Sequence, residues 1–213
     1  MFNAGQVCCA SKRVLVQKSI AEEYTNRLIN ALKLLKVCEP HEKECDMGPL
    51  VSEQAACEVE NKVNQTIKQG ARCVFGGKRY NKTYFEPTVL KDVTADMDIA
   101  KDMEIFGPVV PIIEFEENDE AIKIANQTKY GLSGGVIGRD IKAALSTALK
   151  LESGTTVVNG CGDYRTLYTP FGGHKMSGIG TEGLMLTLEE MMLTKCVALK
   201  GIVEESVSES VLR

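Results

Sequence analysis

The chain has 213 residues and a formal net charge of −4 at neutral pH, which argues against a nucleic-acid surface. Hydrophobic residues make up 44% of the chain and charged residues 25%, as expected for a globular protein that buries its own core. No segment reaches the ~18–20 consecutive apolar residues of a membrane span, and the first residues do not resemble a signal peptide. We therefore expect a soluble cytoplasmic protein with no nucleic-acid or membrane partner.

The first elements predicted are a strand over residues 13–17 (RVLVQ) and a helix over residues 19–36. Ser19 and Glu22 have the spacing of a capping box at the start of this helix. One apolar stripe of helical period runs through Ile20, Tyr24, Leu28, Leu32 and Leu35. The stripe predicts which face of the helix is buried.

The next helix is predicted to begin at Ser52 and to end before Gly70, a residue suited to the position after a helix. A strand over residues 71–77 and an extended segment over residues 84–90 follow. Pro87 cannot donate a hydrogen bond to a sheet, so we expect this segment at an edge or in an irregular region.

The alternation of strands and helices continues to the C-terminus. We expect strands at 109–116, 133–138, 155–160 and 195–203, and helices at 117–128, 139–152 and 181–193. Asn118 and Asp140 are the predicted N-caps of the first two of these helices. Such alternation predicts an α/β domain with a mainly parallel sheet covered on both faces.

A dinucleotide-binding fold normally opens with a strand, a G-x-G-x-x-G turn and a helix. The sequence contains no such unit. Gly178, Gly180 and Gly183 have the wrong spacing and follow a loop.

There are eight cysteines, an even number, but a chain of 213 residues builds a core without disulfides. We predict that most of them are small buried side chains. The sequence has no C-x-x-C pair, and His41 and His174 stand apart, so we expect no metal site.

Cys8 and Cys9 are adjacent in the segment FNAGQVCCA, where Gly5 permits an unusual backbone conformation. A cysteine acts as a nucleophile when its thiolate is accessible and stabilised by a positive charge or by backbone donors. Composition alone favours the other interpretation, in which both sulfurs are buried and inert.

Three further stretches allow either a functional or a structural interpretation. Glu104 and Phe106 precede a Gly–Pro turn, which either presents the carboxylate at a cleft or leaves it as a solvated loop charge. Residues 170–183 contain five glycines, typical of a loop that either approaches something closely or is a flexible connection. We expect His174 to be a loop residue there rather than a general base. Residues 126–132 (NQTKYGL) are predicted to be structural, with Tyr130 packed.

Taken together and in this order, five stretches resemble signatures of the aldehyde dehydrogenase superfamily. They are FNAGQVC (2–8), EIFGPVVP (104–111), NQTKYGLSGGV (126–136), SGTTVVNG (153–160) and PFGGHKMSGIGTEG (170–183). The resemblance implies the three-layer αβα catalytic domain of that family over residues 1–200, followed by a tail over 201–213.

The resemblance also implies roles for particular residues. Cys8, two positions after the Gly–Gln pair, would be the nucleophile that attacks the aldehyde carbon. Its backbone N–H would help to hold the oxyanion. Glu104 would bond the hydroxyls of the nicotinamide ribose of NAD or NADP, with Phe106 packed nearby. A thiohemiacetal and then a thioester would form on Cys8, and water or coenzyme A would release the product.

The matching motifs belong to the C-terminal half of the family's chain. The family's Rossmann-like cofactor domain and its general-base glutamate lie upstream of these motifs, so we expect that the isolated chain does not oxidise an aldehyde with NAD or NADP. The last strand, at 195–203, would take part in homo-oligomer contacts. The alternative is a non-catalytic interaction or redox-responsive module of the same fold, in which Cys9 captures an oxidised Cys8.

Overall fold

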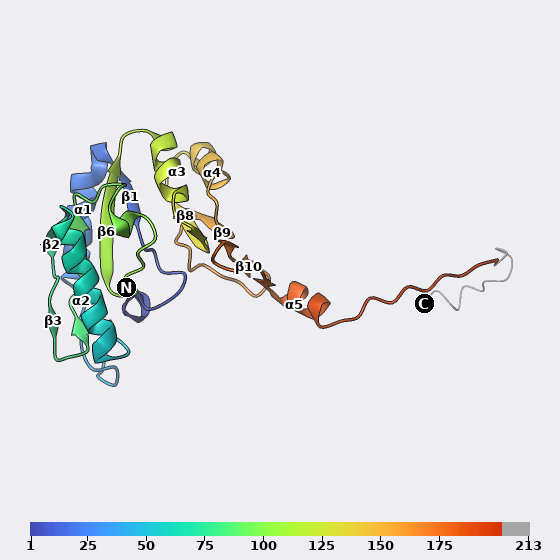
Figure 1. Cartoon of the computed structure of the whole chain (residues 1–213), viewed down its shortest axis with the longest axis horizontal. Helices are drawn as coiled ribbons and strands as arrows, with labels where there is room; N and C mark the ends of the chain where they lie inside the picture. Colours follow the sequence, from blue (N-terminus) through green and yellow to red (C-terminus); the bar gives the residue numbers. More distant parts are fainter. Residues whose placement is uncertain (202–213) are drawn as a thin grey trace.

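The computed structural model describes residues 1–201, and its main sheet has four strands in the order β1–β6–β5–β2 (Figure 1). These strands are β1 (Val14–Gln17), β2 (Arg72–Phe75), β5 (Thr88–Lys91) and β6 (Val109–Phe115). β6 pairs in parallel with both β1 and β5, whereas β2 pairs antiparallel with β5 at one edge. The prediction of a mainly parallel sheet is confirmed.

Two helices, α1 (Lys18–Leu32) and α2 (Glu53–Lys68), cover opposite faces of this sheet. The neighbouring residues Ile112 and Ile113 of β6 point to opposite sides, as strand geometry requires. Ile112 belongs to the apolar cluster of α1, and Ile113 belongs to that of α2. The layers are therefore helix, sheet and helix, as expected for a three-layer αβα fold.

The ends of the two helices differ in how well they match the positions predicted from the sequence. At α2, the Ser52 hydroxyl accepts a hydrogen bond from the Ala55 N–H at 3.1 Å, and Gly70 follows the helix with φ +117°. The capping box predicted at Ser19 is wrong, because α1 begins at Lys18 and has no side-chain cap. Glu22 instead forms an ion pair with Lys91 on β5.

The second half of the chain adds a βαβ unit made of β8 (Ser133–Val136), α4 (Ile141–Ala148) and β9 (Thr155–Val158). The helix that precedes it, α3 (Asn118–Asn126), contributes Ile124 to the apolar cluster of α2. β8 and β9 pair in parallel as a sheet of two strands. The Asp140 carboxylate caps α4, as predicted. Asn118 is not the cap of α3 but its first residue, and its amide donates to the Thr147 hydroxyl at 2.8 Å.

The remaining elements are short. They are η1 (Phe2–Gly5), β3 (Arg79–Tyr80), β4 (Tyr84–Phe85), η2 (Asp98–Ala100), β7 (Tyr130–Gly131), β10 (Phe171–Gly172), β11 (His174–Lys175), β12 (Thr181–Glu182) and α5 (Leu184–Glu190). None of the helices in residues 1–201 is long and apolar enough to cross a membrane.

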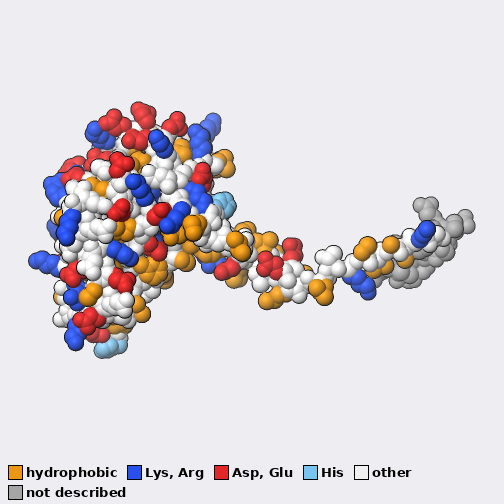
Figure 2. All heavy atoms as spheres, viewed as in Figure 1, with side chains coloured by type: hydrophobic (Ala, Val, Ile, Leu, Met, Phe, Trp, Pro, Cys, Tyr) orange, Lys and Arg blue, Asp and Glu red, His pale blue; other side chains and the backbone are white. Residues whose placement is uncertain are grey.

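The chain leaves the compact body through α5 and continues as an extended segment (Figure 1). The strand predicted at 195–203 is wrong for residues 195–201, which have no regular structure, while residues 202 and 203 lie outside the described part. A strand needs a neighbour for its backbone hydrogen bonds, and this segment has none within residues 1–201. Apolar side chains gather along α5 and this segment (Figure 2).

Candidate active site

The predicted nucleophile lies in an irregular turn between η1 and β1. Cys8 is exposed there, while Cys9 is partly buried. Burial raises the pKa of the Cys9 thiol, and the adjacent Cys8 raises it further. The Ala10 N–H donates to the Val7 carbonyl at 3.2 Å and closes the turn. Of the two cysteines, Cys8 is therefore the more exposed.

Gln6 ties this turn to the loop that precedes α2. Its side-chain oxygen accepts the Val51 N–H at 2.8 Å, and its amide nitrogen donates to the Asn3 carbonyl at 3.1 Å. Both ends of one side chain are therefore bound to backbone, which fixes the approach to Cys8.

Two glycines let three segments meet behind the turn. Gly5 has φ +75°, and a Cβ atom on it would stand 2.2 Å from the Gly107 carbonyl oxygen. A Cβ atom on Gly107 would stand 2.6 Å from a methyl group of Val59 on α2. Since neither position has room for a side chain, the Cys8 segment packs directly on the Glu104–Pro108 turn.

Glu104 and Phe106 lie on that turn with their side chains accessible. Phe106 has φ +57°, and 41% of it is exposed. Together with Gln6 and residues 45–51 it lines a groove of about 710 Å³. Cys8 and Cys9 do not line this groove, so the structure brings the predicted residues to neighbouring positions rather than into one pocket.

Lys12 connects the Cys8 turn with the Glu104–Pro108 turn, and no motif in the sequence singled it out. Its ammonium group lies 3.0 Å from the Val7 carbonyl oxygen, 2.8 Å from Glu104 Oε1 and 4.7 Å from the centre of the Phe106 ring. On the other side of the turn, the Lys62 ammonium donates to the Glu104 carbonyl at 2.8 Å. The Glu104 residue is thus held by its side chain and by its backbone.

Arg13 anchors the residue next to Lys12. Its guanidinium donates to the carbonyls of Ala100, Ile124 and Ala125 at 2.9, 2.9 and 3.0 Å. Burial lowers the pKa of this guanidinium from its ordinary value, and Asp102 opposes that effect. An arginine stays charged in any case, so its three bonds to carbonyls fix the start of β1.

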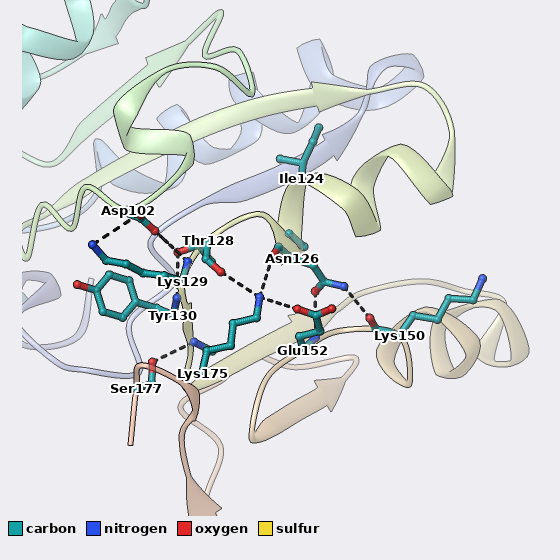
Figure 3. A network of polar contacts seen from close by, with 12 residues as sticks. Asp102, Ile124, Asn126, Thr128, Lys129, Tyr130, Lys150, Glu152, Lys175 and Ser177 are labelled. Atoms are coloured by element: carbon teal, nitrogen blue, oxygen red, sulfur yellow. Dashed lines mark hydrogen bonds and ion pairs between the residues drawn. The ribbon is translucent and has the colours of Figure 1, made fainter. Parts of the chain in front are cut away.

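The glycine-rich loop, residues 170–183, does approach something closely, but what it approaches is the chain itself. A Cβ atom on Gly154 would stand 1.7 Å from the Gly172 carbonyl oxygen. The Lys175 ammonium donates to the carbonyls of Asn126 and Thr128 and pairs with Glu152 (Figure 3). These contacts join the loop to the segment that follows α3.

The same network confirms a structural role for Asn126, whose amide bonds the backbone of Lys150 and Glu152. His174 lies exposed in β11, paired with Gly131 of β7. The prediction that Tyr130 packs is wrong: 43% of it is exposed, and the Lys129 ammonium lies 5.4 Å from its ring centre.

The prediction that most cysteines are buried is also wrong, because none of the eight is buried. Cys38 and Cys45 form a disulfide in the loop before α2, and the other six are free. These two residues lie only seven positions apart, and the intervening turn brings them together. Within residues 1–201, no group of three or more His, Cys, Asp or Glu side chains could hold a metal ion.

The fold and the site define a class of α/β domain in which an exposed cysteine turn packs on a Glu-x-Phe-Gly-Pro turn. A model of the aldehyde dehydrogenase family matches residues 1–197, and the chain belongs to this family. The resemblance seen in the sequence is confirmed. The domain boundary at residue 200 stays a prediction.

Similar proteins support this assignment. Lactaldehyde dehydrogenase of Methanococcus maripaludis is 39% identical over 201 residues. The structure of a glyceraldehyde-3-phosphate dehydrogenase from Methanocaldococcus jannaschii complexed with NADP is 40% identical, with a TM-score of 0.83 over 89% of this chain. The structure of betaine aldehyde dehydrogenase from Staphylococcus aureus in complex with NAD+ is 36% identical, with a TM-score of 0.86 over 98% of this chain.

The match covers only part of each relative. The chain spans 43% of the lactaldehyde dehydrogenase, 41% of the glyceraldehyde-3-phosphate dehydrogenase and 42% of the betaine aldehyde dehydrogenase.

Proposed function

We propose that this chain carries the nucleophile of an NAD- or NADP-dependent aldehyde dehydrogenase that oxidises a small aldehyde to a carboxylic acid. Cys8 is the nucleophile, and Glu104 and Phe106 contact the cofactor. The observation that carries the proposal is the direct packing of the exposed Cys8 turn on the turn that bears Glu104 and Phe106, through Gly5 and Gly107. The relatives whose structures contain NADP and NAD+ support the choice of cofactor.

The chemistry follows from an accessible thiolate. The Cys8 sulfur attacks the aldehyde carbon, a C–S bond forms, and the carbonyl oxygen becomes an oxyanion that the Cys8 N–H would help to stabilise. When bound, NAD or NADP supplies the acceptor for the hydride that leaves this carbon. The Cys8 thioester that results is then cleaved by water or by a thiol such as coenzyme A.

The residues present fit such a cofactor. Among the residues that the structure describes, no hydrogen-bond donor contacts the second carboxylate oxygen of Glu104, Oε2, and half of the side chain is exposed. A carboxylate oxygen of this kind accepts hydrogen bonds from sugar hydroxyls. The exposed ring of Phe106 offers an apolar surface beside it.

Site-resolved alkylation of the 213-residue chain tests the nucleophile. Iodoacetamide should modify Cys8 faster than the exposed Cys196, and an added small aldehyde should slow the modification of Cys8 only. Cys8→Ser removes the fast site and leaves the other cysteines unchanged. If Cys9 or Cys161 is the fast site in both proteins, Cys8 is not the nucleophile.

We expect the chain by itself not to reduce NAD or NADP with an aldehyde, because its sequence contains no dinucleotide-binding turn. Absorbance of the reduced nicotinamide during incubation with an aldehyde measures this. Steady production of NADH by the purified chain, lost in Cys8→Ser, would show that it is a complete enzyme.

A second candidate function is a redox-responsive module. The disulfide between Cys38 and Cys45 and the adjacency of Cys8 and Cys9 support it. In this case a hydroperoxide oxidises Cys8 to a sulfenic acid, and the Cys9 thiol displaces water to form a disulfide. Mass spectrometry after treatment with peroxide distinguishes the candidates. In the redox module, Cys8 and Cys9 form a disulfide and the peptide loses two hydrogens. In the enzyme, Cys8 is oxidised further to a sulfinic or sulfonic acid.

We further propose that the chain forms a homo-oligomer. Leu184, Met185 and Leu188 of α5 are each about half exposed, and Met191 and Leu193 beyond it are more exposed still. An apolar surface of this kind favours association. Light scattering that gives a monomer at high micromolar concentration would contradict this.

A further inference from the structure

Lys12 is the only side chain described above that contacts both the Cys8 turn and the Glu104–Phe106 turn. Its neighbour Arg13 is fixed by three carbonyls, so Lys12 starts from a rigid backbone position. Its side chain is only 27% exposed although it carries a charge. An ammonium group that gives up most of its water requires polar partners in return.

The Lys12 ammonium group has three partners. They are the Val7 carbonyl at 3.0 Å, Glu104 Oε1 at 2.8 Å and the face of the Phe106 ring at 4.7 Å. A carbonyl, a carboxylate and an aromatic face are all favourable partners of an ammonium group. Val7 immediately precedes Cys8, and the other two partners carry the proposed cofactor contacts.

The arrangement also affects the charge near Val7, the residue that immediately precedes Cys8. With Lys12 in place, the Glu104 carboxylate is paired through Oε1 with a positive charge, and about half of its side chain is exposed. Without Lys12, a partly exposed carboxylate would lie uncompensated next to the turn. Phe106, whose φ of +57° is a strained value for a non-glycine residue, would lose the cation that contacts its ring.

We propose that Lys12 is a positioning residue: it orients the Glu104 carboxylate and the Phe106 ring toward the cofactor and removes negative charge from the surroundings of Cys8. The part of this inference that concerns the cofactor rests on the proposed function. The part that concerns charge does not, because it can be measured on the Cys8 sulfur directly.

Two alkylating agents of different charge provide the measurement. Anionic iodoacetate and neutral iodoacetamide react with the same sulfur. The rate with iodoacetate divided by the rate with iodoacetamide therefore reports the local electrostatic potential at Cys8, and a more negative potential lowers this ratio. In Lys12→Met the carboxylate is uncompensated, and we expect this ratio to fall about five-fold. Lys12→Arg should keep the ratio, and Lys12→Met combined with Glu104→Gln should restore most of it.

Lys18→Met is the matched control. It removes the same charge from an exposed Lys–Glu pair, Lys18 with Glu116 at 2.5 Å, on another part of the surface. The ratio at Cys8 should not change in this variant. A purely structural role of Lys12 would alter the rates of both reagents alike and leave their ratio constant.

The outcomes separate the two proposals. A ratio that Lys12→Met leaves unchanged overturns the role of Lys12, whether Cys8 reacts fast or slowly. If Cys8 reacts slowly but the ratio still falls in Lys12→Met, the proposed nucleophile is overturned and the role of Lys12 stands. If Lys12→Met does not fold, Glu104→Gln alone tests the same charge, and there the ratio should rise; no rise would count against the proposal.

Discussion

The Gly107 carbonyl oxygen occupies the position where a side chain on Gly5 would begin. A Cβ atom at Gly5 would stand 2.2 Å from this oxygen, and the φ of +75° at Gly5 is one that other residues rarely adopt. The contact joins segments about a hundred residues apart in sequence, and it decides where Cys8 lies relative to Glu104 and Phe106. Substitutions at Gly5 and at Gln6 test separately how the Cys8 segment is held.

Gly5→Ala should destabilise the protein and displace the Cys8 turn, because a backbone carbonyl cannot move aside as a side chain can. We expect the free energy of unfolding in urea to fall by about 3 kcal/mol. Gly180→Ala is the matched control, since a Cβ atom there meets nothing within 4 Å. Equal stability of the two variants would show that the Gly5 contact is not tight in solution.

Gln6→Ala should loosen the same turn from its other side. It removes the acceptor of the Val51 N–H, and because Val51 is exposed we expect a loss of about 0.5–1.5 kcal/mol in the free energy of unfolding. Hydrogen exchange at the Val51 amide should become faster. Gln54→Ala, which removes only an exposed pair with Glu58 on α2, serves as control and should change stability little. Unchanged hydrogen exchange at the Val51 amide would show that Gln6 does not hold this segment.

Much of the fold follows from local patterns in the sequence. Strand and helix periods predicted the parallel pairing of β6, and the caps at Ser52 and Asp140 were correct because they depend on neighbouring residues only. The capping box at Ser19 was wrong, since α1 already begins at Lys18, and Glu22 pairs instead with Lys91, far away in sequence. Local spacing carries no information about such a partner.

The site shows the same division. Cys8, Glu104 and Phe106 were found through motifs, but Lys12 had no local signal. Its ion-pair partner Glu104 lies more than ninety residues further along the chain, so a lysine before a strand reads as an ordinary surface charge. The strand expected at 195–203 failed over residues 195–201 for a related reason: its apolar residues favour a strand, but the described chain offers no edge with which to pair.

The disulfide between Cys38 and Cys45 predicts a definite thiol count. Under denaturing conditions an aromatic disulfide reagent should titrate six thiols before reduction and eight after it. Cys38→Ala combined with Cys45→Ala should lower the free energy of unfolding by about 2 kcal/mol, because closing a short loop restricts the unfolded chain. Cys196→Ala, at an exposed free cysteine, is the control and should have no effect. Eight thiols in the unreduced protein would rule the disulfide out.

Asp102 makes the stability of the site depend on pH. The Lys129 backbone N–H donates to its carboxylate at 2.9 Å and the Thr128 hydroxyl at 3.0 Å, and these bonds lower the pKa of Asp102 below its ordinary value of 3.8. Because the folded state prefers the ionised form, this stabilisation is fully present above that value and is lost as the pH falls through the lower folded value. Asp102→Asn should therefore melt at a lower temperature than wild type at neutral pH, and the difference should shrink below a pH of about 3.8. Asp96→Asn, at an exposed aspartate, is the control. A melting difference that stays constant from neutral to acidic pH would show that the carboxylate charge is not what Asp102 contributes.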